Sequence, residues 1–327
     1  MTDVTIAIVN WNTRKLLEDC LKSLPAGTAG LHAQVIVVDN GSRDGSADMV
    51  RRRFPDMTLI ANEENLGFAR GNNQACALAR GRYFLLLNPD TIVRPGAVGT
   101  MAEFLDAHTE AAGVTCRLLN LDGSFQRYYK RLPSWPAVLG TFTVCKNLFP
   151  ENRWSQAFYM EGEAFDRDVP VEQPPATCLM LRRTLFSGST VLDERFPILF
   201  NDIDLCRTLK DRGHTLWFLP NAEVVHYGSG GGVGQMGDEA IVDYMIGLIR
   251  YYRKHDGPVV AVALWTLLTI NSLFVLLVGF GKVAVGRRDP GWFRHELRRR
   301  IRLAIGPEVF RYPPGFRTEI PHIMETA

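Results

Sequence analysis

Four polar side chains stand directly after apolar segments of the kind that form buried strands. Asn10 ends Thr5–Asn10, Asp39 ends the run QVIVVD, Asn65 follows the third such segment, and Asp90 follows YFLLL. In sheets built from parallel strands, ligands bind beyond the carboxyl ends of the strands. We therefore expect these four residues to line one ligand site.

The residues around Asp39 fit recognition of a nucleotide base. A carboxylate at a strand end can accept hydrogen bonds from the imide of uracil or thymine, and the following turn, with Asn40 and Ser42, supplies further donors. Asn10 and Asn12, at the end of the first apolar run, are assigned to the same site. Asn-Gly is also a common turn, so this segment alone is weak.

The segment Asn65–Asn73 opens a helical pattern with small residues and amides. A helix N-terminus favours anions, so this one is predicted to face a diphosphate, with Arg70 as a charge partner. Gly67, Asn72 and the later Asn88 are included in the predicted nucleotide site. The alternative is a plain helix cap made by Asn65.

Two residues are predicted to bind a metal. Asp90, in Asn88-Pro89-Asp90-Thr91, offers the hard oxygen that Mg²⁺ or Mn²⁺ prefers, and His226 at the end of a later strand could be a second ligand. The alternatives are a turn that closes a strand and a structural histidine.

Asp202 is the predicted general base. It lies in Asn201-Asp202-Ile203-Asp204, which follows the run FPILF and begins a helix. Acidic residues are also favoured in the first turn of any helix, which is the competing explanation.

The elements that must position these residues alternate between strand and helix. Strands are expected at Thr5–Asn10, Gln34–Asp39, Met57–Asn62 and Tyr83–Leu87, and helices at Arg14–Ser23, Ser46–Phe54 and Gly67–Ala79. This alternation predicts an α/β fold: one Rossmann-like domain over residues 1–249 with a mostly parallel central sheet. Residues 1–112 would form its nucleotide-binding half and 113–249 its catalytic half. From about Gly113 the pattern loosens, and order returns at Thr177–Leu181, Asp202–Asp211 and a strand pair ending at His226.

Charge is distributed unevenly along the 327 residues. Residues 1–249 carry 24 Lys/Arg and 29 Asp/Glu, whereas residues 250–327 carry 13 and 6. An acidic body without a basic face argues against a nucleic-acid partner, and a basic tail suits anionic lipid. The six scattered cysteines are expected to be reduced and mostly buried. The N-terminus does not look like a signal peptide, which places the chain in the cytosol.

The basic tail, residues 250–327, is predicted to form hydrophobic and amphipathic helices that bind the membrane surface through 258–305. Val259–Gly281 is almost wholly apolar and long enough to cross a bilayer, and Gly291–Ile305 places apolar residues at helical spacing among arginines. Whether the apolar helix spans, re-enters or packs in a dimer stays open, as does a homo-oligomer.

Together these stretches resemble the family 2 inverting glycosyltransferases of GT-A fold, over about residues 4–235. The subgroup most similar is the bacterial rhamnosyltransferases of cell-wall and O-antigen assembly. The resemblance rests on residues 9–12, 37–46, 65–73, 86–91, 201–207 and 226–228.

The resemblance implies roles for three acids. The family's base-binding acid matches Asp39, its metal-binding D-x-D matches Asn88-Pro89-Asp90, and its catalytic acid matches Asp202. The chain departs from the family where Asn88 replaces the first acid of D-x-D and Asn201 replaces the first acid of the later pair. The absence of Q-x-x-R-W and of an array of spans argues against a processive synthase.

The implied activity is transfer of a sugar from a nucleotide-sugar donor. The first expected donor is dTDP-rhamnose, and the second is a UDP-hexose. The expected acceptor is a glycan or a polyprenyl-diphosphate-linked glycan at the cytoplasmic face of the membrane. Arg127, Trp135 and Asn201 are expected on the acceptor side, the first two in the loop Arg127–Trp135. Two rivals remain: a sugar nucleotidyltransferase, which usually needs a Gly-rich loop after the first strand, and a membrane scaffold that binds nucleotide sugar without turnover.

Overall fold

The computed structural model describes residues 2–188, 190–228, 239–306, 309 and 322–323. The chain divides into two compact units. The first comprises Met1–Leu132, Tyr159–Gln235 and Thr318–Ala327, and the second comprises Pro133–Phe158 and Met236–Arg317. The units do not follow the expected boundary at residue 249, because a segment from the middle of the chain clusters with the C-terminal helices.

The first unit begins with the predicted alternation of strands and helices. Its elements are β1 (Val4–Asn10), α1 (Arg14–Gly27), β2 (Ala33–Asn40), α2 (Ser46–Arg53), β3 (Thr58–Asn62), α3 (Phe68–Ala77) and β4 (Tyr83–Leu87). Every residue of β1 and β4 is buried, which explains why these strands are continuous apolar runs without alternation. α1 buries Leu17, Cys20, Leu21 and Leu24, at the helical spacing of one face.

The second half of this unit is more ordered than the sequence pattern indicates. It contains β5 (Thr91–Val93), α4 (Ala97–Ala107), β6 (Ala111–Leu119), β7 (Val169–Val171), β8 (Cys178–Arg182), the short η1 (Arg183–Leu185), β9 (Phe186–Ser187), α8 (Asn201–Asp211), β10 (Thr215–His226) and β11 (His322–Ile323), which pairs with β9. β6 continues to Leu119, although the pattern loosens at Gly113. β10 is one strand with an irregularity between Leu219 and Glu223, and the expectation of a strand pair was wrong.

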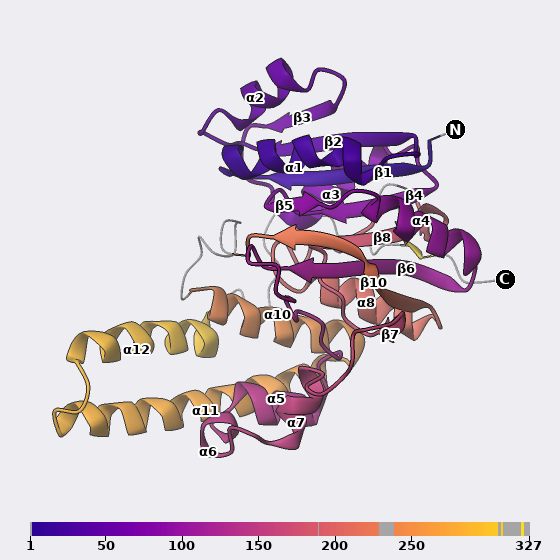
Figure 1. Ribbon diagram of the computed structural model, residues 1–327. Helices are drawn as coiled ribbons and strands as arrows, with labels where there is room; N and C mark the ends of the chain where they lie inside the picture. The colour runs from indigo at the N-terminus through magenta and orange to yellow at the C-terminus, as the bar shows by residue number, and fades with distance from the viewer. Residues whose placement is uncertain (1, 189, 229–238, 307–308, 310–321, 324–327) are drawn as a thin grey trace. The chain divides into compact units, whose positions relative to one another are not determined.

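Nine of these strands form one mixed sheet in the order β3-β2-β1-β4-β8-β6-β10-β5, with β7 also paired to β10 (Figure 1). β9 and β11 form a separate two-stranded sheet. β3, β2, β1 and β4 are parallel to one another, and β6 is parallel to β10. β8 lies antiparallel between β4 and β6. The predicted α/β class with a mostly parallel sheet is confirmed.

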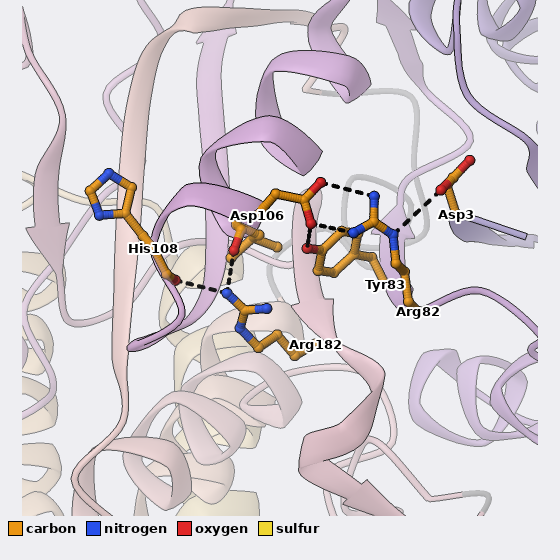
Figure 2. Close-up of polar contacts among 7 residues, drawn as sticks. Asp3, Arg82, Tyr83, Asp106, His108 and Arg182 are labelled. Atoms are coloured by element: carbon orange, nitrogen blue, oxygen red, sulfur yellow. Dashed lines mark hydrogen bonds and ion pairs between the residues drawn. The ribbon is translucent and has the colours of Figure 1, made fainter.

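A cluster of polar side chains lies at the end of the sheet opposite to Asp39 and connects neighbouring elements there (Figure 2). Asp106, at the end of α4, accepts hydrogen bonds from Arg82 Nη2 at 2.9 Å and from the Tyr83 hydroxyl at 2.7 Å. Arg182, on β8, donates to the backbone carbonyl of His108 at 2.7 Å. The hydrogen bond from Arg82 holds the pKa of Asp106 below its usual range. The cluster ties α4 to the start of β4 and the end of β8, so its role is structural.

The second unit is helical within its described residues. It contains α5 (Trp135–Phe142), α6 (Cys145–Leu148), α7 (Arg153–Phe158), α10 (Glu239–His255), α11 (Pro258–Ala284) and α12 (Pro290–Ile305). Phe142 of α5 contacts Tyr244 of α10, with 5.3 Å between the ring centroids. α11 is long and apolar enough to cross a membrane, by length and composition alone.

The cysteines match the expectation from the sequence. All six are free, and five of them are buried.

Candidate active site

Asp39 is the last but one residue of β2, and its carboxylate organises the turn that follows. Its Oδ1 accepts the Ser42 amide at 2.9 Å, and its Oδ2 accepts Asn10 Nδ2 at 2.8 Å. Asn10 is fully buried, and its Oδ1 accepts the Thr13 hydroxyl at 2.6 Å. Because its amide group is used in this way, Asn10 holds Asp39 in place. Each Asp39 oxygen keeps a second lone pair for a ligand.

Asn12 and Asn40 extend this network on either side. Asn12, which has a left-handed φ of 53°, accepts the Arg43 amide at 2.8 Å and donates its own amide to Ser42 Oγ at 2.8 Å. Asn40 donates to the Gly67 carbonyl at 3.1 Å. The predicted nucleotide residues of β1 and β2 are therefore brought together in one hydrogen-bonded turn region.

The N-terminus of α3 is capped by the protein itself. The amides of Phe68 and Ala69 both donate to the Pro197 carbonyl, at 2.7 and 3.2 Å, and Asn65 Oδ1 accepts the Gly67 amide at 2.9 Å. The two first amides of this helix already have a partner within the chain, and a diphosphate contact at this helix end stays a prediction. The contact instead joins α3 to the loop that precedes α8.

The other predicted residues of α3 differ in exposure. Arg70 is half-buried, whereas Asn72 is fully buried and donates to the Phe68 carbonyl at 2.9 Å. Asn73 accepts the amides of Val191 and Leu192 at 2.9 and 3.0 Å. A nucleotide contact for Arg70 or Asn72 stays a prediction.

Asp90 and His226 meet at the carboxyl ends of β4 and β10. His226 Nε2 lies 3.5 Å from Asp90 Oδ1, and Asp90 Oδ1 is buried and has no hydrogen-bond partner within the described part of the chain. The other ring nitrogen of His226, Nδ1, lies 2.8 Å from Gln126 Oε1, and Gln126 also donates to the His226 carbonyl at 3.2 Å. A buried carboxylate oxygen without a partner, next to an oriented imidazole, fits a divalent cation.

This pair is a partial metal site. Among the described residues, no group of three or more His, Cys, Asp or Glu side chains is placed to hold a metal. A cation on Asp90 and His226 would therefore need oxygen ligands from a bound substrate. Phosphate oxygens are typical partners for Mg²⁺ held by one or two carboxylates.

Asp202 lies close to the loop that carries Asp90. Its Oδ2 accepts the Ala176 amide at 3.4 Å, and the next residue, Thr177, accepts the Asn88 amide at 2.9 Å. This short path through the start of β8 connects the first turn of α8 to the Asn-Pro-Asp segment. Sequence positions 88 and 202 therefore belong to one region of the first unit.

Asp202 carries a perturbed pKa. Burial raises the pKa of its carboxyl group, while the amides of Ile203 and Ala176 and the charge of Lys130 act in the opposite direction. Burial also lowers the pKa of Lys130, and the Asp202 carboxylate opposes that shift. A carboxylate with a raised pKa is a stronger base, which suits proton abstraction near neutral pH.

The three residues expected on the acceptor side make other contacts. Asn201 is buried and donates to the Ile198 carbonyl at 2.6 Å, which closes the turn before α8. Arg127 donates to the carbonyls of Met160 and Glu163 at 3.1 and 3.0 Å. Trp135 belongs to the second unit and packs against Tyr252 at 5.6 Å between ring centroids. Their acceptor role stays a prediction.

Sequence reasoning missed Gln126, Lys130 and Pro197. Each lies in an irregular segment where no periodicity marks an element, and each acts through a contact more than 70 residues away. The one available signal was the polar content of residues 120–131.

The chain is similar to known proteins over much of its length. The model of glycosyl transferase family 2 matches residues 5–187. An N-acetylglucosaminyl-diphospho-decaprenol L-rhamnosyltransferase of Mycobacterium tuberculosis is 28% identical over 248 residues, which are 69% of this chain and 77% of that protein. The O-antigen biosynthesis protein RfbC of Myxococcus xanthus is 24% identical over 261 residues, covering 74% of this chain and 18% of that protein.

A solved structure is also similar. The mannosyltransferase PcManGT of Pyrobaculum calidifontis, in complex with GDP-Man and Mn²⁺, is 16% identical with a TM-score of 0.49, and the match covers 92% of this chain and 84% of that one.

Proposed function

This chain belongs to glycosyl transferase family 2, and we propose that it moves rhamnose with inversion from dTDP-rhamnose to a glycan or polyprenyl-diphosphate-linked acceptor in cell-envelope polysaccharide synthesis. The mycobacterial relative, a decaprenol-linked rhamnosyltransferase, supports both the sugar and the lipid carrier. The O-antigen relative supports the same kind of pathway.

One observation carries the proposed chemistry: Asp90 Oδ1, which is buried and has no hydrogen-bond partner among the described residues, lies 3.5 Å from His226 Nε2, in the same region as Asp202. The path from Asp202 through Ala176 and Thr177 to Asn88 consists of two hydrogen bonds. A donor diphosphate at Asp90 would therefore have a base in the same region of the first unit. This juxtaposition is what a single-displacement transfer needs.

Asp39 is the proposed ligand of the donor's base. Its carboxylate is 2% exposed and is held by Asn10 and by the Ser42 amide, so its orientation is fixed before a ligand binds. Free lone pairs on a fixed carboxylate accept the imide N–H of thymine or uracil and disfavour cytosine, which has no such donor. The turn residues Asn12, Asn40 and Ser42 would surround the nucleotide.

Asp90 and His226 are the proposed holders of Mg²⁺ or Mn²⁺. When bound there, a cation would neutralise the negative charge that develops on the diphosphate leaving group. No general acid would then be required. Gln126 orients His226 through its ring Nδ1 and thereby directs Nε2 toward the metal position. The neutral amide at residue 88 leaves Asp90 as the single carboxylate of the Asn-Pro-Asp segment.

Asp202 is the proposed general base. Its carboxylate takes the proton of the acceptor hydroxyl as that oxygen forms a bond to the anomeric carbon. The bond from this carbon to the diphosphate oxygen breaks on the opposite face, and its electron pair leaves with the nucleoside diphosphate. Its burial supports the role, because it keeps the pKa of the carboxyl above the usual Asp range.

The test is Asp202→Asn, measured by release of nucleoside diphosphate in the presence of acceptor. We expect normal donor binding and a loss of turnover on the order of 10²–10⁴-fold, the usual contribution of a general base. The matched control is Asp211→Asn at the exposed end of the same helix, which should keep full activity. Near-normal turnover in Asp202→Asn removes Asp202 from this role. Pyrophosphate release from a nucleoside triphosphate would indicate a nucleotidyltransferase, and binding without any turnover would indicate a scaffold.

The membrane is the proposed location of the acceptor. α11 has the length and composition of a membrane-binding helix, and a polyprenyl carrier would reach the enzyme from the bilayer. We place the protein at the cytoplasmic face, where the donor is available.

A further inference from the structure

α12 doubles back along α11 in the second unit (Figure 1). Three contacts fix an antiparallel register. Trp265 donates to the Ala304 carbonyl at 3.2 Å, and Arg300 donates to Ser272 Oγ at 3.2 Å. A Cβ placed on Gly279 would lie 3.0 Å from the Trp292 ring, so Gly279 lets the two helices approach closely. The pairing therefore covers most of the length of α11.

This pairing places charges beside the middle of the apolar helix. Glu296 binds Arg300 at 2.6 Å and Arg299 at 3.2 Å, and Arg300 reaches Ser272 of α11. If α11 crossed the bilayer with α12 attached, these groups would enter the hydrocarbon region, where charged side chains are costly. If α12 detached, all three contacts that fix the register would be lost. Either outcome argues against a span.

The face of α11 away from these contacts is apolar and exposed. Its side chains follow helical spacing and include Ile270 (60% exposed), Leu273 (62%) and Leu277 (71%). The same stripe also contains Val259, Val262, Phe274 and Phe280. The first charged residue after Pro258 is Lys282, so a whole helix face is free of charge. A bare stripe of this length indicates a binding surface.

Exposed basic residues follow this stripe along the chain. Arg287 and Arg288 lie exposed in the turn between the two helices, and Arg294 and Arg298 lie exposed one turn apart on α12. An apolar helix face next to exposed arginines of the same hairpin matches a bilayer surface with anionic headgroups.

We propose that the α11–α12 hairpin lies in the plane of an anionic bilayer, with the exposed stripe of α11 in the acyl boundary and the arginines at the phosphates, and that α11 does not cross the membrane. This proposal rests on the proposed membrane association and specifies how the two helices lie on the membrane. It does not depend on the proposed transfer reaction. The body of the protein would then need no segment on the far side of the membrane.

The first test is flotation of the full chain with vesicles of phosphatidylglycerol and phosphatidylcholine, compared with phosphatidylcholine alone. We expect binding to the anionic vesicles, and about tenfold or greater weakening in Leu273→Glu/Leu277→Glu. Leu121→Glu, which changes an exposed leucine of the first unit, is the matched control and should bind like the wild type. Unchanged binding of the double variant overturns the proposal. A dimer that the double variant abolishes, without vesicle binding by the wild type, also overturns it. Donor binding by the variant is measured in parallel, so that failure of the nucleotide site is recognised separately.

The second test decides between lying on the membrane and crossing it. Single cysteines are introduced as Arg287→Cys, beyond α11, and Arg52→Cys, an exposed position of α2. An impermeant maleimide is applied to sealed inside-out membrane vesicles, with the wild type as the background. We expect both positions to react from the same side. Reaction of Arg52→Cys with protection of Arg287→Cys would show a crossing and overturn the proposal.

Discussion

Lys130 and Asp202 form the charge pair with the most direct consequence for catalysis. A general base must be deprotonated, so activity rises with pH through its pKa, and burial already raises the pKa of Asp202. The charge of Lys130 lowers that pKa. Lys130→Met should therefore move the acid limb of the kcat/KM profile to higher pH. The control is Lys210→Met near the end of α8, where the lysine pairs with Glu172 at 2.8 Å. If the acid limb of Lys130→Met stays where it is in the wild type, the charge of Lys130 does not act on the pKa of the catalytic base.

Gln126 is expected to matter through His226. The ring Nδ1 of His226 lies 2.8 Å from Gln126 Oε1, and partners of this kind typically contribute 10–100-fold to metal affinity. Gln126→Leu should weaken Mn²⁺ binding in the presence of donor by about that factor, as measured by electron paramagnetic resonance. Because both residues act on one ligand, adding Gln126→Leu to His226→Ala should cost little more. Fully additive losses would contradict this coupling.

The residues that sequence reasoning found are those that follow strands. Asp39 lies in the buried second half of β2 and Asp90 follows the fully buried β4, and the geometry of parallel sheets sends such positions to one edge. Gln126 and Lys130 have no such marker, because their function depends on contacts with His226 and Asp202, about 100 and 70 residues away. The metal, base and nucleotide roles of all these residues stay predictions until the experiments above are done.

At the scale of elements, α3 meets the loop before α8 in a close contact near the site. Gly67 has φ 84° and ψ 168°, and a Cβ there would lie 2.8 Å from the Pro197 carbonyl oxygen. Gly67→Ala should therefore lower the free energy of unfolding by about 1–3 kcal/mol through backbone strain, and by more through displacement of Pro197. Urea denaturation measures the loss.

Gly30→Ala is the matched control for this variant. Gly30 has the same φ of 84°, yet a Cβ there would meet no atom within 4 Å. The difference between the two variants isolates the contact with Pro197. Equal destabilisation by both substitutions would show that this contact contributes nothing. A drop in turnover in Gly67→Ala alone would show that the loop positions Asp202.

An element could be predicted where the sequence pattern that marks it lies within the element itself. β1, β2 and β4 are apolar runs bounded by turns, and α1 shows the spacing of an amphipathic helix, so the sequence predicted them. The antiparallel insertion of β8 between β4 and β6 could not be predicted, because strand order depends on pairing between distant segments. The length of β6 was missed for the same reason.

At the scale of the whole molecule, the two compact units are discontinuous in sequence. α5, α6 and α7 belong with α10, α11 and α12, although about 80 residues of the first unit lie between these groups. Contacts such as Asp243 with Arg302, at 2.6 Å, assign α10 to the second unit. A boundary placed where composition changes, at residue 249, could not reveal this, because composition does not record long-range packing.

The division into units makes a prediction for ligand binding by the whole chain. Asp39, Asp90, Asp202 and His226 all lie in the first unit, so dTDP-rhamnose with Mn²⁺ should stabilise that unit. A ligand at about 100 times its Kd adds about 2.7 kcal/mol, and this should raise the Tm of one calorimetric transition by about 5–10 °C. A transition of the second unit, if it is resolved, should not move.

The metal dependence of this shift is the deciding measurement. Because Asp90 and His226 offer too few ligands to hold a cation without phosphate oxygens, Mn²⁺ alone should change the Tm little, and nucleotide sugar with chelator should give only a small shift. Asp90→Ala should abolish the additional Tm shift that Mn²⁺ causes when nucleotide sugar is present. Asp39→Ala should abolish the Tm shift caused by nucleotide sugar, with or without Mn²⁺. Metal-independent stabilisation of full size in the wild type, or an unchanged response in Asp90→Ala, would exclude a cation at Asp90.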